Sequence, residues 1–150
     1  MKAYRSFTRW IGSVRLVRPI LAWLVPRIDT VLLRWGGRIT PFPTMLLTTT
    51  GAATGQPHQA PLWFLAEPGS YIVLASNFGR REPDWSCNLR AEPSCRVALD
   101  GTEIAATAEL VGDEQWDGYF ERFAEFYPTY RDYVADRRAP MWRLVTGTER

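Results

Sequence analysis

The chain has 150 residues, of which 46% are hydrophobic and 23% charged, a composition typical of one globular domain in water. Its longest apolar run, residues 20–25, is far shorter than the roughly 18 residues that span a bilayer, and no signal peptide is expected. One histidine, two cysteines and no cluster at ligand spacing argue against a metal centre and against a histidine-based nucleophile. Seven tryptophans instead favour an aromatic core, a membrane interface or a pocket for a flat ligand.

Charge is distributed unevenly along the chain. Residues 1–40 carry eight Lys/Arg and one acid, a net +7, whereas residues 41–150 carry ten basic and fifteen acidic residues, a net −5. The basic residues alternate with Leu, Ile, Val and Trp, which favours contact of residues 4–35 with an anionic membrane surface over binding to nucleic acid. A solvated helix face would show the same pattern. We expect a cytoplasmic protein, with peripheral contact on the inner face of the cell membrane as one of these two interpretations.

Two helices are predicted in the first 40 residues. Residues 4–24 place an apolar stripe at helical spacing, made of Phe7, Trp10, Ile11, Val14, Val17 and Leu21. Pro19 and Pro26 kink or end this segment, and a second helix over residues 28–35 ends at two glycines. A proline-containing linker follows. We therefore expect a basic amphipathic segment over residues 1–40 and one folded domain over residues 41–150.

From residue 44 the pattern changes to short strands, expected over residues 44–50, 58–66, 71–76, 94–99, 102–110 and 139–146. Asp100-Gly101 is a strong hairpin signal, and residues 67–70 form another turn. One helix is predicted from Pro83 to about residue 91. A second begins near Asp113, with Trp116, Tyr119, Phe120, Phe123 and Phe126 on its buried side. Six strands with hairpin signals and no βαβ alternation predict an antiparallel β-barrel with flanking helices, an α+β fold.

Three segments of this domain could bind a ligand. The turn between the first two strands is rich in threonine and glycine, so its hydroxyls and amides could hold an anionic or carbonyl-rich ligand, although a plain hairpin has the same composition. Residues 73–89 run from the end of a strand through a polar loop with Arg80 and Arg81 to the start of a helix, and loop amides and helix N-termini bind anions. The alternative interpretation of this segment is a capped helix with Trp85 in the core. Tyr130 and Tyr133 project together and could clamp a flat ring, or pack in the core.

Together these segments resemble the deazaflavin-dependent nitroreductases, mycobacterial and other actinobacterial oxidoreductases that use coenzyme F-420, an 8-hydroxy-5-deazaflavin. The resemblance extends over about residues 28–145. It rests on Leu-Thr-Thr-Thr-Gly ending at Gly51, Thr-Gly-Gln-Pro ending at Pro57, Pro-Leu-Trp-Phe-Leu starting at Pro61, Ala75-Ser76, Trp85, Asn88-Leu89 and Tyr-Pro-Thr-Tyr-Arg-Asp-Tyr ending at Tyr133. It implies a split β-barrel of the FMN-binding type, hydride transfer to a quinone or nitroaromatic, and an N-terminal helical segment linked to membranes.

The resemblance also implies roles for matching positions. The phosphate and tail side of the coenzyme would lie against the turn and second strand, at Ala52, Ala53, Thr54, His58, Gln59, Ala60, Pro61, Leu62 and Trp63. The deazaflavin ring would be bordered by Leu74, Ala75, Ser76 and Asn77, and the cradle completed by Asp84, Trp85, Ser86, Cys87 and Asn88. Tyr130 would face the ring and Tyr133 the substrate mouth, so that Ser76, Tyr130 and Tyr133 are the expected catalytic residues.

The chain departs from the family pattern at its cationic positions. Relatives commonly carry basic residues where this chain has Ala52, Ala53, His58 and Asn77, and those cations pair with the coenzyme's phosphate and oligoglutamate tail. Charged hydrogen bonds contribute about 1.5–3 kcal/mol each, so losing two or three could lower affinity about a hundredfold or more. Two alternatives therefore stay open: a split-barrel ligand- or lipid-binding protein with weakened coenzyme affinity, and an FMN-dependent oxidoreductase.

Overall fold

The structure, a computed structural model, describes residues 42–147. The two predicted N-terminal helices, and with them residues 4–35, lie outside the described residues. Along the described chain the elements are β1 (Thr44–Thr50), β2 (Pro57–Glu67), β3 (Ser70–Leu74), η1 (Asn77–Gly79), α3 (Asp84–Ala91), β4 (Ser94–Leu99), β5 (Thr102–Leu110), α4 (Asp113–Phe126), α5 (Tyr130–Tyr133) and β6 (Met141–Thr146). All six predicted strands are present, and β1, β4 and β5 have the predicted bounds.

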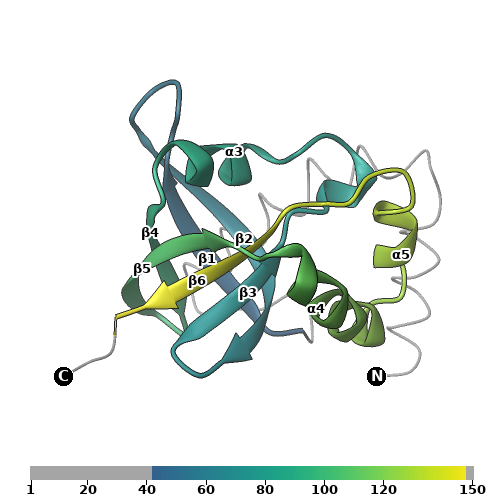
Figure 1. Ribbon diagram of the computed structural model, residues 1–150. Helices are drawn as coiled ribbons and strands as arrows, with labels where there is room; N and C mark the ends of the chain where they lie inside the picture. The colour runs from purple at the N-terminus through teal and green to yellow at the C-terminus, as the bar shows by residue number, and fades with distance from the viewer. Residues whose placement is uncertain (1–41, 148–150) are drawn as a thin grey trace.

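The six strands close into an antiparallel barrel in the order β1-β2-β3-β6-β5-β4, with β4 pairing back to β1 (Figure 1). This confirms the predicted fold class. The hairpins β1–β2, β2–β3 and β4–β5 are local in sequence, whereas the pairing of β6 between β3 and β5 is not. No helix within residues 42–147 is long and apolar enough to cross a membrane.

The barrel interior is filled by the alternate side chains that face inward, because successive residues of a strand point to opposite faces. Met45, Leu47, Val73, Val97 and Leu144 are completely buried there. Helix α3 lies across one end of the barrel, and its Trp85 and Leu89 pack into the same cluster (Figure 1). A large apolar side chain contributes roughly 1.5–3 kcal/mol when fully buried, so Trp85 and Leu89 help to hold α3 against the barrel.

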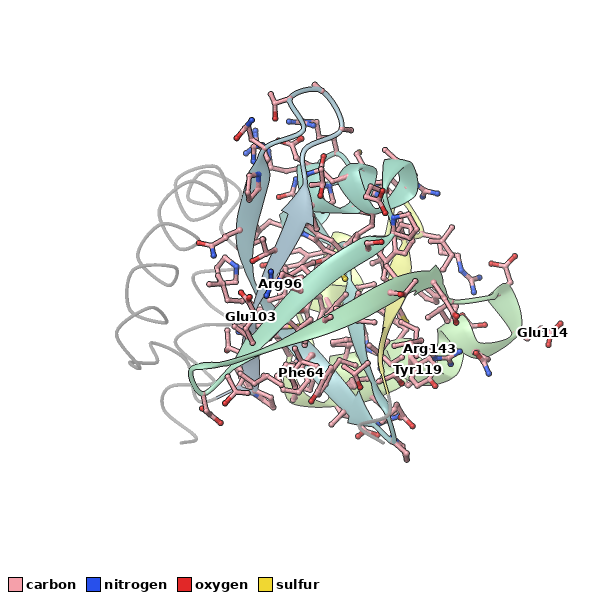
Figure 2. The ribbon with its side chains drawn as sticks, turned by 90° about the vertical axis from the view of Figure 1, so that its left-hand side faces the viewer. Phe64, Arg96, Glu103, Glu114, Tyr119 and Arg143 are labelled. Atoms are coloured by element: carbon pink, nitrogen blue, oxygen red, sulfur yellow. The ribbon has the colours of Figure 1, made fainter. Side chains whose placement is uncertain are left out.

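A second apolar cluster lies outside the barrel, where α4 and α5 cover one side of it (Figure 1). Ile72, Leu74 and Met141 come from the outer faces of β3 and β6, and Phe120 and Phe123 of α4 pack on them. The predicted buried face of α4 is confirmed for Trp116, Phe120 and Phe123, but Phe126 and Tyr119 are only half-buried. The Tyr119 hydroxyl instead points to a polar neighbour, because Arg143 of β6 donates a hydrogen bond to it over 3.1 Å. Both residues are labelled in Figure 2.

The outer faces of β4 and β5 are polar and exposed. Arg96 and Glu103 form an ion pair of 2.6 Å across these two strands, away from both apolar clusters (Figure 2). The covering helices therefore leave this side of the barrel to solvent, and the candidate site has to be sought near α3 and α5.

Strand β2 is one residue longer at each end than predicted and β3 begins one residue earlier, whereas the end of β3 and the start of β6 differ from the prediction for one shared reason. Strand β3 ends at Leu74 instead of residue 76, and its partner β6 begins at Met141 instead of residue 139. Pro140 has no N–H group and cannot extend the ladder as a donor, although its carbonyl still accepts from the amide of Ala75 over 2.8 Å. Because the ladder stops here, the chain is free to turn at Ser76, which adopts a helical conformation with φ −74° and ψ −35°.

Candidate functional site

Segments far apart in sequence lie along one edge of the molecule, from α5 to the end of the barrel that α3 covers (Figure 1). The β1–β2 turn projects beside α3, and the loop after β3 runs from η1, next to α5, along to the start of α3 (Figure 1). All three sequence clusters that could bind a ligand thus lie along one continuous edge of the molecule. The long-range strand pairing places them there, since β1, β3 and β6 all reach this end of the barrel.

The β1–β2 turn is a compact loop closed by its own backbone. The amide of Gly51 donates to the carbonyl of Gln56, and the amide of Gly55 donates to the carbonyl of Gly51, both over 2.8 Å. Gly51 is buried, and a Cβ atom added to it would lie 2.6 Å from the Thr54 hydroxyl oxygen and 2.9 Å from Nε2 of His58. Because glycine has no Cβ atom, the Thr54 and His58 side chains can lie against the backbone at position 51, and a larger residue there would displace them.

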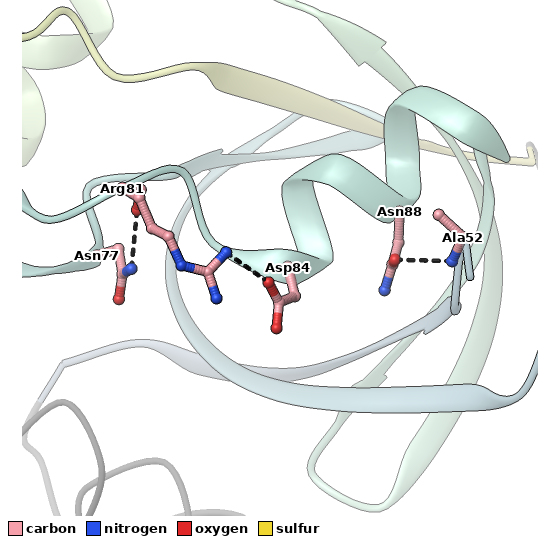
Figure 3. A network of polar contacts seen from close by, with 5 residues as sticks. All are labelled: Ala52, Asn77, Arg81, Asp84 and Asn88. Carbon is pink, nitrogen blue, oxygen red and sulfur yellow. Dashed lines mark hydrogen bonds and ion pairs between the residues drawn. The ribbon is translucent and has the colours of Figure 1, made fainter. Parts of the chain in front are cut away.

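Asn88 of α3 connects this turn to the helix (Figure 3). Its Oδ1 accepts a hydrogen bond of 2.9 Å from the backbone amide of Ala52, and its Nδ2 donates one of 3.1 Å to the hydroxyl of Thr49. Asn88 is 6% exposed and Thr49 is 2% exposed. Both the oxygen and the nitrogen of the Asn88 side-chain amide are therefore hydrogen-bonded within the protein.

Ser86 makes the second polar attachment of α3. Its hydroxyl, which is fully buried, donates to Glu82 over 2.6 Å and accepts from Nε1 of Trp142 on β6 over 2.7 Å. Glu82 also accepts from Nε of Arg90 over 3.0 Å. Burial of Glu82 opposes its ionisation, but the hydrogen bonds from Ser86 and Arg90 outweigh that effect and hold its pKa below the ordinary value.

The loop after β3 has an unusual backbone. Asn77, Phe78 and Gly79 all have positive φ, of 43°, 54° and 76°. Ser76 before them is 8% exposed and its hydroxyl makes no hydrogen bond within residues 42–147. Because every fully enclosed polar side-chain atom among those residues has a partner, this hydroxyl must lie where solvent or a ligand reaches it. Non-glycine residues with positive φ are strained and recur at functional sites.

Helix α5 packs directly on this loop. The rings of Phe78 and Tyr133 are 5.6 Å apart, and a Cβ atom on Gly79 would lie 3.2 Å from the Cα and carbonyl oxygen of Tyr133. Tyr130 and Tyr133 project together as predicted, with ring centres 6.0 Å apart, and the hydroxyls of Tyr133 and Tyr127 are 3.3 Å apart.

Tyr130 is a nearly enclosed titratable group of this cluster. It is 7% exposed, and its ring lies edge-on to those of Trp63, Phe123 and Tyr127. Burial, and then the nearby phenol of Tyr127, raise the pKa of Tyr130 far above its ordinary value, so the phenol stays protonated. No partner for its hydroxyl occurs in the described part of the chain, so Tyr130, like Ser76, holds a nearly enclosed O–H that can serve a ligand.

The structure places the predicted site residues in three environments. Exposed on the turn, β2 or α3 are Ala52, Ala53, Thr54, His58, Gln59, Asp84 and Cys87. Half-buried are Ala60, Pro61, Leu62, Trp63 and Asn77, whereas Leu74, Ala75, Ser76, Trp85, Ser86, Asn88, Tyr130 and Tyr133 are buried. The predicted coenzyme contacts of Ser86 and Asn88 stay a prediction, and in this structure both side chains bind other parts of the protein.

Charged groups along the loop and α3 neutralise one another in part (Figure 3). The Arg81 guanidinium pairs with the Asp84 carboxylate over 2.9 Å, and the side-chain amide of Asn77 donates to the Arg81 carbonyl over 2.8 Å. The exposed Arg80 forms no ion pair within residues 42–147, which leaves it available to an anion. Within the same residues no group of three or more His, Cys, Asp or Glu could hold a metal ion.

Sequence reasoning missed several residues that shape this site. Glu82 lies four residues before Ser86, a spacing that brings side chains together on a helix, but Pro83 separates it from the predicted helix. The backbone approach of Gly79 to Tyr133 and the bond from Trp142 to Ser86 join different elements, and no local pattern signals such contacts.

The chain is similar to known proteins in both sequence and fold. The family model described as "F420H(2)-dependent quinone reductase" matches residues 25–144. An F420H(2)-dependent quinone reductase of Mycobacterium tuberculosis is 36% identical over 70 residues, which are 46% of this chain and 47% of that protein, so the chain spans about half the length of the curated relatives it matches.

Two solved structures are similar over most of their length. An F420-H2 dependent reductase (FDR-A) has a TM-score of 0.61 and 31% identity, covering 68% of this chain and 93% of that one. A domain-swapped dimer has a TM-score of 0.64 and 28% identity, covering 79% of this chain and 94% of that one. Because the family model extends through the barrel and all three site segments, the chain belongs to the F420H(2)-dependent quinone reductase family.

Proposed function

We propose that this protein transfers hydride from reduced coenzyme F-420 to a quinone, with nitroaromatic compounds as further acceptors. Family membership supports the cofactor and the class of reaction. The finer assignment depends on this chain's own residues, because the alternatives of a plain ligand-binding barrel and of an FMN enzyme would use the same fold.

One observation carries the proposal: two nearly enclosed hydroxyls, of Ser76 and Tyr130, have no hydrogen-bond partner in the described part of the protein. They come from the loop after β3 and from α5, which pack on each other through Phe78 and Tyr133. Every fully enclosed polar side-chain atom of residues 42–147 has a partner, so these two hydroxyls lie where solvent or a ligand reaches them. Two such available hydroxyls on segments that pack on each other support a site whose ligand completes the hydrogen bonds.

The donor set fits the deazaflavin group. Its ring system is flat and rich in carbonyl groups, so it needs aromatic walls and hydrogen-bond donors rather than cations. Ser76 has a right-handed helical backbone conformation, and Asn77 after it has a left-handed one. Two successive residues in these conformations form a concave stretch of backbone whose amide groups bind electron-rich oxygen atoms. The aromatic cluster of Trp63, Tyr130 and Tyr133 supplies apolar surface beside it.

When bound, the reduced coenzyme supplies the hydride, and the chain's residues bind, orient and exclude water. We assign Ser76 and the two tyrosines to hydrogen bonds with the acceptor's oxygen atoms. Because the raised pKa keeps the Tyr130 phenol protonated, it donates a hydrogen bond to the reduced acceptor and can supply its proton. Tyr133 is placed one helical turn away, where it would border the acceptor.

The remaining predicted residues are assigned by the same proposal to the rest of the coenzyme. The turn residues Ala52, Ala53 and Thr54, with the first residues of β2, would lie along its phosphate and tail. Leu74, Ala75 and Asn77 would border the ring, and the exposed side of α3 would complete the cradle. The free Arg80 guanidinium could offset part of the charge that the two alanines lack.

The test is a titration of the purified full chain with oxidised coenzyme, followed by fluorescence, and an assay of quinone reduction by reduced coenzyme. We expect saturable binding, and slower turnover in Ser76→Ala and Tyr130→Phe with unchanged melting temperature. Thr107→Ala removes a hydroxyl from the outer face of β5, and Tyr71→Phe removes one from a ring that packs against the barrel-interior cluster, so both serve as controls outside the α5 cluster. Absence of saturable binding up to high micromolar coenzyme would refute the proposal, and saturable binding of FMN instead would favour the flavin alternative.

We further propose that residues 1–40 form a basic amphipathic segment that rests on the inner face of the cell membrane, attached to a catalytic barrel over residues 41–150. The net charge of +7 and the apolar stripe of that segment support this location. The full chain should float with anionic vesicles and not with neutral ones, and Arg15→Glu with Arg18→Glu should weaken flotation. Equal flotation with both vesicle types would contradict the electrostatic part of the proposal.

A further inference from the structure

Asn88 occupies a position from which it controls the β1–β2 turn. The backbone N–H of Ala52 can only donate, so the atom facing it must be the side-chain oxygen of Asn88, and the NH2 group must then face Thr49. The orientation of the amide is therefore defined by both of its partners. Thr49 itself is enclosed on β1, beneath the turn, and has no surface from which to touch a ligand.

The helix that carries Asn88 is anchored at its other side. Ser86 binds Trp142 on β6 and Glu82, and Trp85 and Leu89 are packed in the barrel. A continuous series of contacts thus runs from β6 through α3 to the turn. Displacement of the turn relative to α3 would break both hydrogen bonds of Asn88, whose loss leaves buried polar groups unpaired.

The position of this turn matters more here than in a turn with long cationic side chains. Ala52 and Ala53 have no polar side-chain atoms, so at these two positions the turn can hold a ligand only through its backbone groups. Backbone donors have no rotamers with which to adjust, and their distance to a ligand is set entirely by where the turn lies.

We propose that Asn88 is a positioning residue for coenzyme binding, which places the turn at Ala52 without itself touching the coenzyme. This inference rests on the proposed function and deepens it. It differs from the sequence-based prediction, in which Asn88 contacts the coenzyme directly. The variants Asn88→Ala, Thr49→Val and Thr49→Ser separate the two possibilities, because Thr49 can act only through Asn88 or the turn.

The experiment measures coenzyme dissociation constants by fluorescence, together with hydrogen exchange of the Ala52 amide in the coenzyme-free full chain. Asn88→Ala, which removes both hydrogen bonds of Asn88, should raise Kd about tenfold, and Thr49→Val, which removes only the bond to Thr49, should raise it about threefold. Thr49→Ser, which keeps the hydroxyl, should stay within about twofold of wild type. Exchange at Ala52 should accelerate in the same order, while kcat for quinone reduction at saturating coenzyme stays unchanged.

A control for general loss of stability is Leu144→Val, which loosens the barrel interior on β6 away from the turn. It should lower the melting temperature but leave Kd and the exchange of Ala52 at wild-type values. A raised Kd in Asn88→Ala with unchanged protection of Ala52 would overturn the inference in favour of direct contact. An unchanged Kd in both Asn88→Ala and Thr49→Val would overturn it as well. If wild type binds no coenzyme, the proposed function fails, and the inference fails with it.

Discussion

Replacing Gly79 by alanine is a sharp test of how the loop after β3 and α5 are held together. Gly79 has φ +76°, a conformation that costs an alanine about 1–2 kcal/mol. The new Cβ would also lie 3.2 Å from the Cα and carbonyl oxygen of Tyr133, which are backbone atoms and cannot rotate away. The loop or α5 would have to shift by a few tenths of an ångström.

The size of the effect follows from these two contributions. Overpacking at a site that cannot adjust costs typically about 1–3 kcal/mol, so together with the backbone conformation we expect Gly79→Ala to lose about 2–5 kcal/mol of unfolding free energy. At the size of this chain, 1 kcal/mol corresponds to about 2–4 °C, which gives a fall of roughly 4–20 °C in Tm. Because the shift moves Ser76 relative to Tyr130 and Tyr133, quinone reduction should fall more than the loss of folded protein explains.

Gly69 provides the matched control. It lies in the β2–β3 turn with φ +68°, and a Cβ atom there would meet nothing within 4 Å. Gly69→Ala should therefore show the conformational cost alone, about 1–2 kcal/mol, and normal activity of the folded enzyme. Urea unfolding and initial rates measured on both variants decide the question. Equal loss of stability in the two variants, with equal activity, would refute the tight contact between the loop and α5.

Three further outcomes can be measured. The pKa of Glu82 is lowered in the folded protein, so as pH falls below the unfolded value of about 4.5 the unfolded chain takes up the proton first and stability is lost. Glu82→Gln should therefore show less loss of Tm between neutral and acidic pH than wild type, and an equally steep loss would contradict the Ser86 and Arg90 contacts. Tyr130→Phe should change the unfolding free energy by no more than about 0.5 kcal/mol, since the hydroxyl has no described protein partner, and a larger loss in urea would reveal a structural bond. In a spectroscopic titration, wild type and Tyr130→Phe should give the same phenolate signal near pH 10, because burial raises the pKa of Tyr130 far beyond that range; a missing step in the variant would show that Tyr130 titrates normally.

The sequence predicted most of the secondary structure because its signals are local. Alternating side chains over residues 44–50, 94–99 and 102–110 and the Asp100-Gly101 turn identify strands and a hairpin without reference to the rest of the chain. The errors occurred where a distant partner decides. Strand β3 ends early because Pro140, more than sixty residues away, cannot continue the ladder, and Tyr119 is only half-buried because Arg143 of β6 binds its hydroxyl.

The same distinction between local sequence signals and contacts with distant partners applies to the candidate site. Residue types and spacing singled out the turn at Gly51, the segment around Ser76 and the tyrosines of α5, and their resemblance to a known family linked them to coenzyme F-420. They did not distinguish side chains that are available to a ligand from side chains that are used within the protein. Ser86 and Asn88 are hydrogen-bonded inside the protein, whereas the hydroxyls of Ser76 and Tyr130 have no partner among residues 42–147.

By itself, then, the sequence determined the six strands, the helices α3 and α4 and the barrel class, and it indicated the three segments of the candidate site, since each of these signals depends on neighbours within a few residues. Only the tertiary structure decided which groups are free. Whether a hydroxyl or amide is available depends on what lies across from it, and at this site the partners come from β1, β6, α3 and α5, which the closed barrel alone brings together.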